Sequence, residues 1–193
     1  NAMLQKKAKI INDIYQEGHP LKIKIASVFL ESFLFYSGFF APLYYLGNAK
    51  MANVAEIIKL ILRDESVHGT YIGYKFQIGY NQLSEAEQDE LKNWAFNLLY
   101  ELYENEMEYT AYIYDSLGWT EKVGTFIRYN ANKALQNLGF DPLFPDTAED
   151  VDPLVMNGIS TGTSNHDFFS QVGNGYLLGV VETMEDEDYN KWL

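Results

Sequence analysis

The sequence RDESVHG, residues 63–69, lies in the stretch from Asn53 to Gln77 around which the rest of the chain is organised. Asn53 with Glu56 three residues later is the pattern of a helix N-cap and its reciprocal acidic partner, so a helix is predicted to begin here. Apolar residues then recur at helical spacing on one face, at Ile58, Ile61 and Ile72. The stretch is therefore predicted to be one long helix with an apolar face directed at a core.

Between Ile61 and Ile72 the same face carries Glu65 and His68 in place of core side chains. Residues three apart on a helix lie about 4.5 Å apart along its axis and nearly on one side, so both groups can reach one point. A carboxylate and an imidazole in such a position are costly to bury unless they are paired, protonated or bound to a cation. A core histidine paired with a glutamate explains the pattern as well as a cation site does, so other residues must decide.

Further helices are predicted from apolar periodicity, capping residues and helix breakers. Their predicted ranges are Met3–Gln16, Leu21–Leu46, Ser84–Leu117 and Glu121–Leu138. Pro42 is expected to kink or end the second of them, because proline lacks the backbone N–H that a helix interior needs. Ser84 with Glu87 forms a capping box, and Gly118 and Gly139 are predicted stops. Nothing in this part alternates with period two for long enough to form a sheet, so the fold class is predicted to be all-α.

The charge balance is strongly acidic, with 27 Asp and Glu against 14 Lys and Arg and a net charge of −13. Nucleic acids and anionic membranes bind clustered basic residues, so neither is expected as a partner. The chain has no cysteine, which excludes disulfides, thiolate metal ligands and cysteine nucleophiles and fits a cytoplasmic protein. The apolar stretch from Ile25 to Gly47 has Glu31 as its single charged residue, but Gly38 and Pro42 interrupt it. A buried core helix therefore explains it better than a membrane span.

Composition divides the chain into two parts near Phe140. Residues 1–140 are predicted to form the helical bundle, with residues 1–2 resembling the scar of a cleaved expression tag. Residues 141–193 hold several prolines and many Gly, Asn, Ser and Asp, which is typical of loops. They end in an acidic stretch, Glu182 to Leu193, whose aromatic residues a partner could bury. This second part is predicted to be a loop-rich region with an extended tail.

A second inward-facing carboxylate is predicted on the helix before the central one. Glu31 shares its helix face with Val28 and Phe35, so its side chain is expected to point into the core. Oxygen ligands together with one imidazole suit iron or manganese. Carboxylate-bridged di-metal sites in ferritin-like bundles use a Glu from each of two helices and a Glu-x-x-His from each of two others. This chain provides one of each, half of such a site, and neither His19 nor His166 follows a glutamate by three residues.

Four motifs are specific in their order and spacing. They are ESFLFYSG at residues 31–38, RDESVHG at 63–69, YNANK at 129–133 and GYLLGVVETMEDEDYNKWL at 175–193. Together they closely resemble the small, radical-generating subunit of class Ib ribonucleotide reductase. The resemblance covers Leu4 to Leu193 and corresponds to the C-terminal part of that subunit, which implies a ferritin-like helical bundle. It also implies that the family's N-terminal part, which supplies an Asp, the first Glu-x-x-His and the radical-bearing Tyr, is absent from this sequence.

The resemblance implies a role for individual residues. Glu31, Glu65 and His68 match ligands of the di-iron or di-manganese centre. Asp64 matches an acid that orients a ligating histidine and lies on the radical-transfer route. Tyr176 matches the tail tyrosine that passes the radical to the large subunit. The apolar wall near the radical is matched by Phe35, Phe39 and Ile61.

The same resemblance implies an activity and partners. In the intact family member the metals react with an oxidant to form a tyrosyl radical, and the large catalytic subunit uses that equivalent to reduce ribonucleoside diphosphates. The expected partners are the large subunit, bound through the tail, a flavodoxin-like activating protein and a second copy of the chain in a homodimer or larger oligomer. This chain alone is expected to lack reductase activity. Two alternatives remain. One is a ferritin-like oxidase or metal-storage protein, but metal storage would not need the acidic tail with Tyr176. The other is a metal-free helical oligomer, which metal bound to the purified chain would exclude.

Overall fold

The computed structural model describes residues 1–159, and most of these residues are helical. The helices are α1 (Ala2–Glu17), α2 (Pro20–Ser32), α3 (Tyr36–Gly47), α4 (Ala52–Tyr80), α5 (Glu85–Tyr114), the 3-10 helix η1 (Asp115–Leu117), α6 (Thr120–Asn137) and α7 (Pro153–Ile159). No strand occurs among the described residues, and the prediction of an all-α fold is confirmed.

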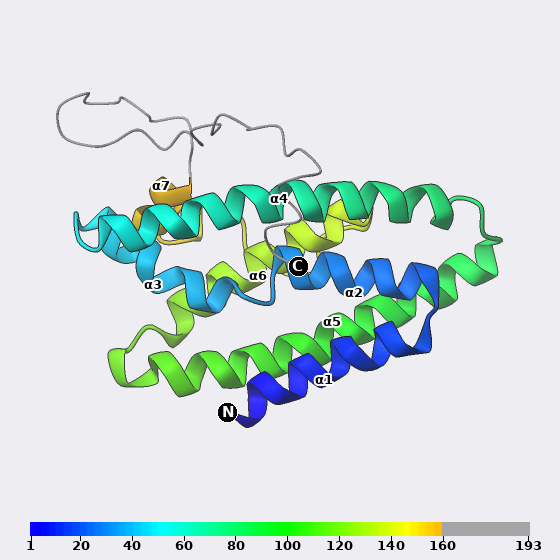
Figure 1. The fold of residues 1–193 in the computed structure, drawn as a ribbon, viewed down its shortest axis with the longest axis horizontal. Helices are drawn as coiled ribbons and strands as arrows, with labels where there is room; N and C mark the ends of the chain where they lie inside the picture. The colour runs from blue at the N-terminus through cyan, green and yellow to red at the C-terminus, as the bar shows by residue number, and fades with distance from the viewer. Residues whose placement is uncertain (160–193) are drawn as a thin grey trace, which may run out of the picture. The chain divides into compact units, whose positions relative to one another are not determined.

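The long helices run alternately in opposite directions along one axis (Figure 1). α4 packs most extensively on α2, and α3 continues from the end of α2 beside the first half of α4. α6 contacts α2, α3, α4 and α5, so it forms the centre of the bundle. α1 packs on α2 and α5 from the outer side. The face of the central helix that carries the RDESVHG motif therefore meets the helix that carries Glu31.

Several predicted helix ends are confirmed. The Ser84 hydroxyl accepts a hydrogen bond from the backbone N–H of Glu87, and the Glu87 carboxylate accepts one from the backbone N–H of Ser84, so the capping box at the start of α5 is complete. Gly118 and Gly139 have φ angles of 67° and 80°, the left-handed conformation that glycine adopts without strain. Asn1, set aside as a tag residue, caps α1 by accepting from two backbone N–H groups.

The predicted start of the central helix was wrong. α4 begins at Ala52, and the residue before it, Met51, is in the left-handed conformation with φ 52° and provides no side-chain cap. Asn53 lies inside the first turn and is exposed, while Glu56 forms an ion pair of 3.6 Å with Lys59. The turn before α4 is made by backbone geometry, with Ala49 also at positive φ, so the capping pattern in the sequence was not used.

The predicted break at Pro42 was also misplaced. Pro42 lies inside α3, and the chain breaks instead at residues 33–35, between α2 and α3. Phe33 leaves the helical conformation with φ −149° and ψ −37°. The carbonyl that a proline at position 42 leaves unpaired belongs to Gly38, which is exposed and can bond to water. The break lies two residues after Glu31 and so belongs to the surroundings of the candidate site.

The core extends past the region predicted to end the bundle. Asn132 on α6 holds the following segment: its side-chain oxygen accepts from the backbone N–H groups of Leu143 and Phe144, both at 2.9 Å. Val151 and Val155 are buried in the same core as the long helices, and α7 packs on α3. The part predicted to be loop therefore contains one short helix within the described residues.

The apolar stretch considered as a membrane span is part of this core. Pro20–Gly47 is apolar and long enough by composition, but 61% of its most apolar window is buried inside the fold. The break at residues 33–35 also divides it into two helices. The burial of this stretch agrees with the prediction of a core helix.

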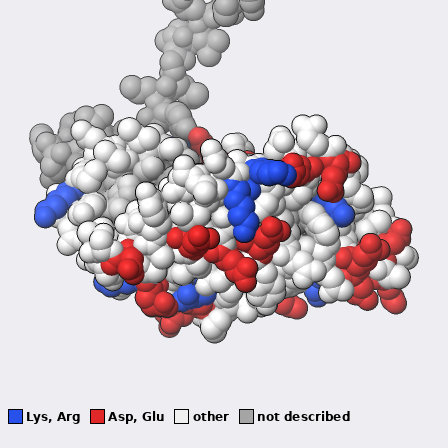
Figure 2. All heavy atoms as spheres, turned by 90° about the horizontal axis from the view of Figure 1, so that it is seen from below, with Lys and Arg blue, Asp and Glu red and all other residues white. Residues whose placement is uncertain are grey.

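Acidic and basic side chains are interspersed on the face shown in Figure 2, with acidic groups more widespread and no large basic patch on that face.

Candidate metal centre

Two glycines let α4 approach its neighbours closely. A Cβ atom at Gly69 would collide with the Ser32 hydroxyl on α2, and one at Gly73 would collide with the backbone carbonyl of Asn137 at the end of α6. A side chain at Gly73 would push α4 outward, because the Asn137 carbonyl belongs to the backbone and cannot move aside as a flexible side chain can. Gly69 leaves the space that the Ser32 hydroxyl of α2 occupies. The glycine that ends the RDESVHG motif therefore helps to bring Glu65 and His68 within reach of α2.

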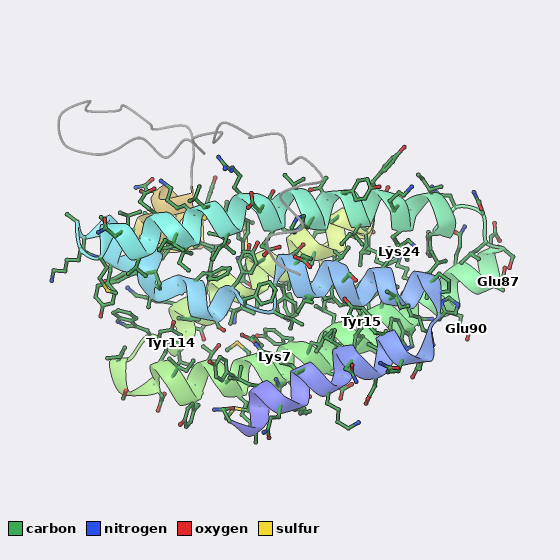
Figure 3. The ribbon with its side chains drawn as sticks, in the orientation of Figure 1. Lys7, Tyr15, Lys24, Glu87, Glu90 and Tyr114 are labelled. Carbon is green, nitrogen blue, oxygen red and sulfur yellow. The ribbon has the colours of Figure 1, made fainter. Side chains whose placement is uncertain are left out.

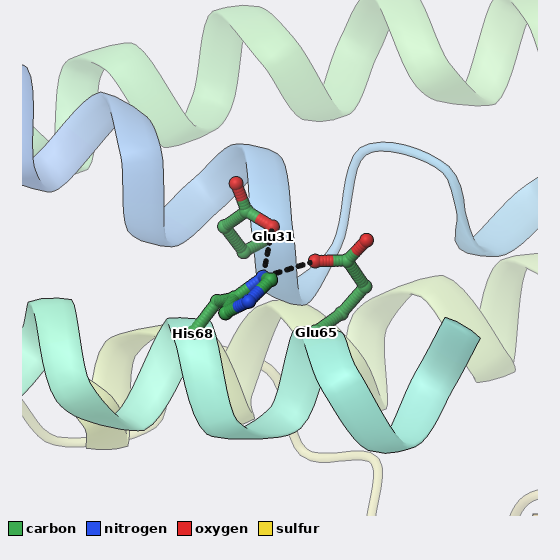
Figure 4. Close-up of side chains that lie close together, drawn as sticks. All are labelled: Glu31, Glu65 and His68. Carbon is green, nitrogen blue, oxygen red and sulfur yellow. Dashed lines mark hydrogen bonds and ion pairs between the residues drawn. The ribbon is translucent and has the colours of Figure 1, made fainter. Parts of the chain in front are cut away.

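Glu31 from α2 and Glu65 and His68 from α4 meet at one point (Figure 4). The Nδ1 atom of His68 lies 3.0 Å from Oε2 of Glu65 and 3.6 Å from Oε2 of Glu31. The three residues each offer one ligand atom, and these atoms all lie within 4.8 Å of one another. The predicted juxtaposition of the two glutamates and the histidine is therefore present.

The cluster lies at an edge of the described bundle and not deep inside it. The side chains of Glu31 and Glu65 are 22% and 20% exposed, whereas that of His68 is 57% exposed. The expectation that the motif occupies fully buried core positions was wrong for His68. Among residues 1–159, α2 covers one side of this part of α4, and the histidine lies beyond the covered strip.

Burial and the closeness of the two carboxylates shift the pKa values of ionisable groups in and beside the cluster. Burial, followed by the neighbouring carboxyl of Glu65, raises the pKa of Glu31 from 4.5 to about 7. The hydrogen bond that the His68 imidazole makes to the Glu65 carboxylate is the largest cause that raises the pKa of His68. Burial first, and then the charges of Glu65 and Glu31, also raise the pKa of Tyr36, which places its phenol near both carboxylates. A cation facing both carboxylates would offset the burial and the neighbouring negative charge that disfavour ionised Glu31.

The donor set fits a hard divalent cation of the iron or manganese type. Carboxylate oxygens and one imidazole nitrogen are the ligands that these metals take in proteins, and the chain has no thiolate that would favour a softer metal. Only a modest rearrangement is needed, because ligand atoms within 4.8 Å of one another can surround one ion at about 2.0–2.2 Å from each. The residues present therefore fit the metal that the sequence predicted.

The other predicted site residues have more varied positions. Asp64 is about half exposed and has its carboxylate 4.0 Å from Nε of Arg63, outside the three-residue cluster. The rings of Phe35 and Phe39 pack together with centroids 6.1 Å apart, and Ile61 is partly buried on α4. Tyr176, together with His166, falls outside the described residues.

A small cavity beside the cluster was not predicted. Its volume is about 220 Å³ and it lies between α2, α4 and α6. Its lining residues are mostly polar: Ser32, Tyr36, Leu62, Ser66, Thr70, Tyr129, Asn130, Lys133, Gln136 and Asn137. Ser32 and Ser66 each follow a ligand candidate directly in sequence, so the cavity adjoins the cluster. Three lining residues belong to the YNANK motif. This motif was singled out in the sequence, but its position at a cavity was not predicted.

A fully buried carboxylate was also missed. Glu106 on α5 is 0% exposed, whereas Glu101, Glu104 and Glu108, for which a solvated face was expected, are exposed. Leu99 and Leu102, seven and four residues earlier, are buried on the same helix face. An acid within an apolar face was the signal that identified Glu31, and the same signal was present here.

An all-α bundle in which two carboxylates and a histidine from neighbouring helices meet is the architecture of ferritin-like proteins, a class in which such side chains hold metal ions. The protein family described as "Ribonucleotide reductase, small chain" matches residues 1–153. The chain therefore belongs to the ribonucleotide reductase small-chain family, and the resemblance predicted from the four motifs is confirmed.

Individual relatives agree with this assignment. The chain is 52% identical over 191 residues to the ribonucleoside-diphosphate reductase subunit beta of Mycobacterium leprae and 51% identical to the ribonucleoside-diphosphate reductase 2 subunit beta of Escherichia coli. These matches cover 98% of this chain but 59% and 60% of the two relatives. The crystal structure of dimanganese(II)-NrdF from Streptococcus sanguinis is similar with a TM-score of 0.82 and 72% identity, over 83% of this chain and 56% of that one. The chain thus spans about three fifths of the curated relatives it matches.

Proposed function

We propose that this chain is part of a class Ib ribonucleoside-diphosphate reductase small subunit and that it supplies three ligands of that subunit's di-metal centre. The observation that carries the proposal is the convergence of Glu31, Glu65 and His68 at one point. A sequence identity of 72% to a protein described as dimanganese(II)-NrdF supports it. The acidic stretch with aromatic residues at the end of the sequence favours this function over metal storage.

In this role the described residues provide metal ligands and balance the charge of the ions. Glu31 and Glu65 each offer a carboxylate oxygen from a different helix, and His68 offers an imidazole nitrogen. When bound, two iron or manganese ions supply the oxidising equivalent that generates a tyrosyl radical in the complete subunit. Ionised Glu31 becomes favourable once a cation faces it, since its high pKa comes from burial and from Glu65. The metal in the similar structure is manganese, and the donor set suits both metals.

The remaining roles follow the family resemblance. Asp64 is proposed to orient a metal ligand and to lie on the radical-transfer route, and Tyr176 to pass the radical onward. Residues 141–193 are proposed to dock on the large catalytic subunit, which reduces ribonucleoside diphosphates, and a flavodoxin-like protein is proposed to activate the centre. The protein is proposed to work in the cytoplasm.

A homodimer or larger oligomer is also proposed. α4 exposes four large apolar or aromatic side chains at helical spacing, Val67, Tyr71, Tyr74 and Ile78, and a further one, Ile57, about three turns earlier. Exposed apolar side chains on one helix face favour association. Sedimentation equilibrium of the chain without metal should give a dimer or larger species, and a monomer at high concentration would contradict this part of the proposal.

Metal binding by the purified chain tests the main proposal. Titration with Mn²⁺, followed by loss of the free-ion signal in electron paramagnetic resonance, should show binding that Glu31→Ala and Glu65→Ala each weaken by at least about tenfold. Glu104→Ala, which removes an exposed carboxylate from α5, should leave the titration unchanged. Equal binding in all variants would show that the cluster holds no metal. The chain alone should have no reductase activity and no stable tyrosyl radical after ferrous iron and oxygen are added.

A further inference from the structure

The break between α2 and α3 is held by side chains from two other helices. Residues 33–35 interrupt the helical hydrogen bonds two residues after Glu31. The ammonium group of Lys7 on α1 donates to the backbone carbonyl of Leu34 at 2.7 Å, and the hydroxyl of Tyr114 on α5 donates to that of Ser37 at 2.7 Å. Lys7 and Tyr114 lie between the ribbons of α5 and the start of α3 (Figure 3). The Leu34 carbonyl, which lies in the break, thus has a donor from α1, and Tyr114 attaches the first turn of α3 to α5.

Glu106 joins these contacts into one network. Its carboxylate is completely buried on α5 and makes an ion pair of 2.7 Å with the ammonium group of Lys7. Its second oxygen accepts a hydrogen bond from the hydroxyl of Ser37, in the first turn of α3. α3 has no side-chain cap from its own N-cap residue, Phe35, and its first turn is held by two contacts with α5, one from Glu106 and one from Tyr114. α1, α3 and α5 are therefore tied together at the break.

Stability alone does not account for a buried ion pair in this position. Removing two charged groups from water costs free energy that their attraction only partly returns, so apolar residues of similar volume often give an equally stable core. A paired lysine and glutamate fix the positions of the groups they contact, because charge-assisted hydrogen bonds form only over a narrow range of distances and angles. Here the partners are the backbone and the first turn on either side of the break, and α2 ends one residue after Glu31.

We propose that Lys7, Ser37, Glu106 and Tyr114 are positioning residues that fix the end of α2 and thereby hold Glu31 in the metal-binding position. The proposal rests on the metal-binding function proposed above, with the break as the connecting element. None of the four residues belongs to the ligand cluster, and the break separates them from it. The network acts on the backbone that carries one ligand, whereas the other two ligands are held by the continuous helix α4.

The test uses the whole 193-residue chain with a neutral variant of the buried pair. Lys7→Met with Glu106→Gln removes both charges, keeps similar volumes and leaves the Leu34 carbonyl without its donor. Leu99→Ala is the matched control, because Leu99 is equally buried on the same face of α5, two turns before Glu106. Measurements are the urea midpoint, amide hydrogen exchange of residues 30–38 and of α4, and Mn²⁺ affinity.

The double variant should exchange amides of residues 30–38 at least tenfold faster, with α4 unchanged, and bind Mn²⁺ about tenfold more weakly. Leu99→Ala should show neither change even where its urea midpoint is lower. The proposal is overturned if the double variant keeps wild-type exchange at the break, or wild-type Mn²⁺ affinity despite faster exchange. If the wild-type chain binds no Mn²⁺, the metal-binding function fails on its own. Faster exchange confined to residues 30–38 then still supports the positioning role, and unchanged exchange still overturns it.

Discussion

Replacing Glu31 by glutamine should make the metal-free protein less sensitive to rising pH. Burial and Glu65 raise the pKa of Glu31 from 4.5 to about 7, so its ionised form is disfavoured in the folded chain relative to the unfolded chain. The corresponding stability is fully present below pH 4.5 and is lost as the pH rises to about 7. At about 1.4 kcal/mol for each pKa unit, the loss has a ceiling of about 3.5 kcal/mol, and solvent at the open edge of the cluster reduces it to about 2 kcal/mol.

Urea unfolding in the presence of a chelator, at pH 5 and pH 8, measures this effect. Wild type should lose about 2 kcal/mol more than Glu31→Gln between the two pH values, because glutamine stays neutral. His68, whose pKa is raised chiefly by Glu65, lowers the stability of both proteins over the same range, so it largely cancels in the difference. Glu104→Gln, at an exposed position, should follow wild type. Parallel curves for wild type and Glu31→Gln would refute the reasoning that the carboxylates lack a countercharge.

Other outcomes follow from individual contacts. Ser84→Ala should lower the free energy of unfolding by about 1 kcal/mol through loss of the cap, and an unchanged urea midpoint would contradict this. Gly73→Ala should lower the free energy of unfolding by about 2 kcal/mol or more, because the added Cβ meets the backbone of α6. Gly38→Ala, with open space around it, should be neutral or slightly stabilising. Equal urea midpoints for the two variants would contradict the close approach of α4. Mn²⁺ affinity should be lower at pH 6 than at pH 8, since Glu31 must release its proton to bind the ion. An affinity that does not change with pH would exclude Glu31 as a ligand. A synthetic peptide of residues 171–193 should inhibit a matching class Ib reductase, and full activity at saturating peptide would exclude a docking role for the tail.

Local patterns were sufficient to predict most of the fold. The Ser84 capping box and the glycines at 118 and 139 act within one turn of the chain, so the sequence identifies them without knowledge of the tertiary structure. The three candidate ligands were also within reach of sequence reasoning. Each is a polar group at a position where helical periodicity expects an apolar one, and the motif spacing indicated that two helices share the site.

The break at residues 33–35 depends on distant partners, and this is why it was misplaced. Lys7 reaches the Leu34 carbonyl across 27 residues of sequence and Glu106 across 99. No local propensity encodes such contacts, so the proline at position 42 was the strongest helix-breaking signal available. Similarly, Asn53 lost its predicted capping role because the turn before α4 is set by positive φ at two other residues. In both cases tertiary packing decided between competing local patterns.

The buried and half-buried carboxylates differ in how their charge is balanced by the described residues, and this difference favours a cation at one cluster over the other. Glu106 faces the permanent positive charge of Lys7 and a hydroxyl donor, so its charge is matched within the chain. Glu31 and Glu65 face one another, and the group that the described residues place against both is His68, which is partly exposed and loses its charge on deprotonation. Adding a divalent cation to the first cluster would displace a satisfied ion pair. Adding it to the second would offset the burial and the repulsion from Glu65 that raise the pKa of Glu31. The same bundle therefore uses one set of acids to fix its backbone and leaves the other available for a cation.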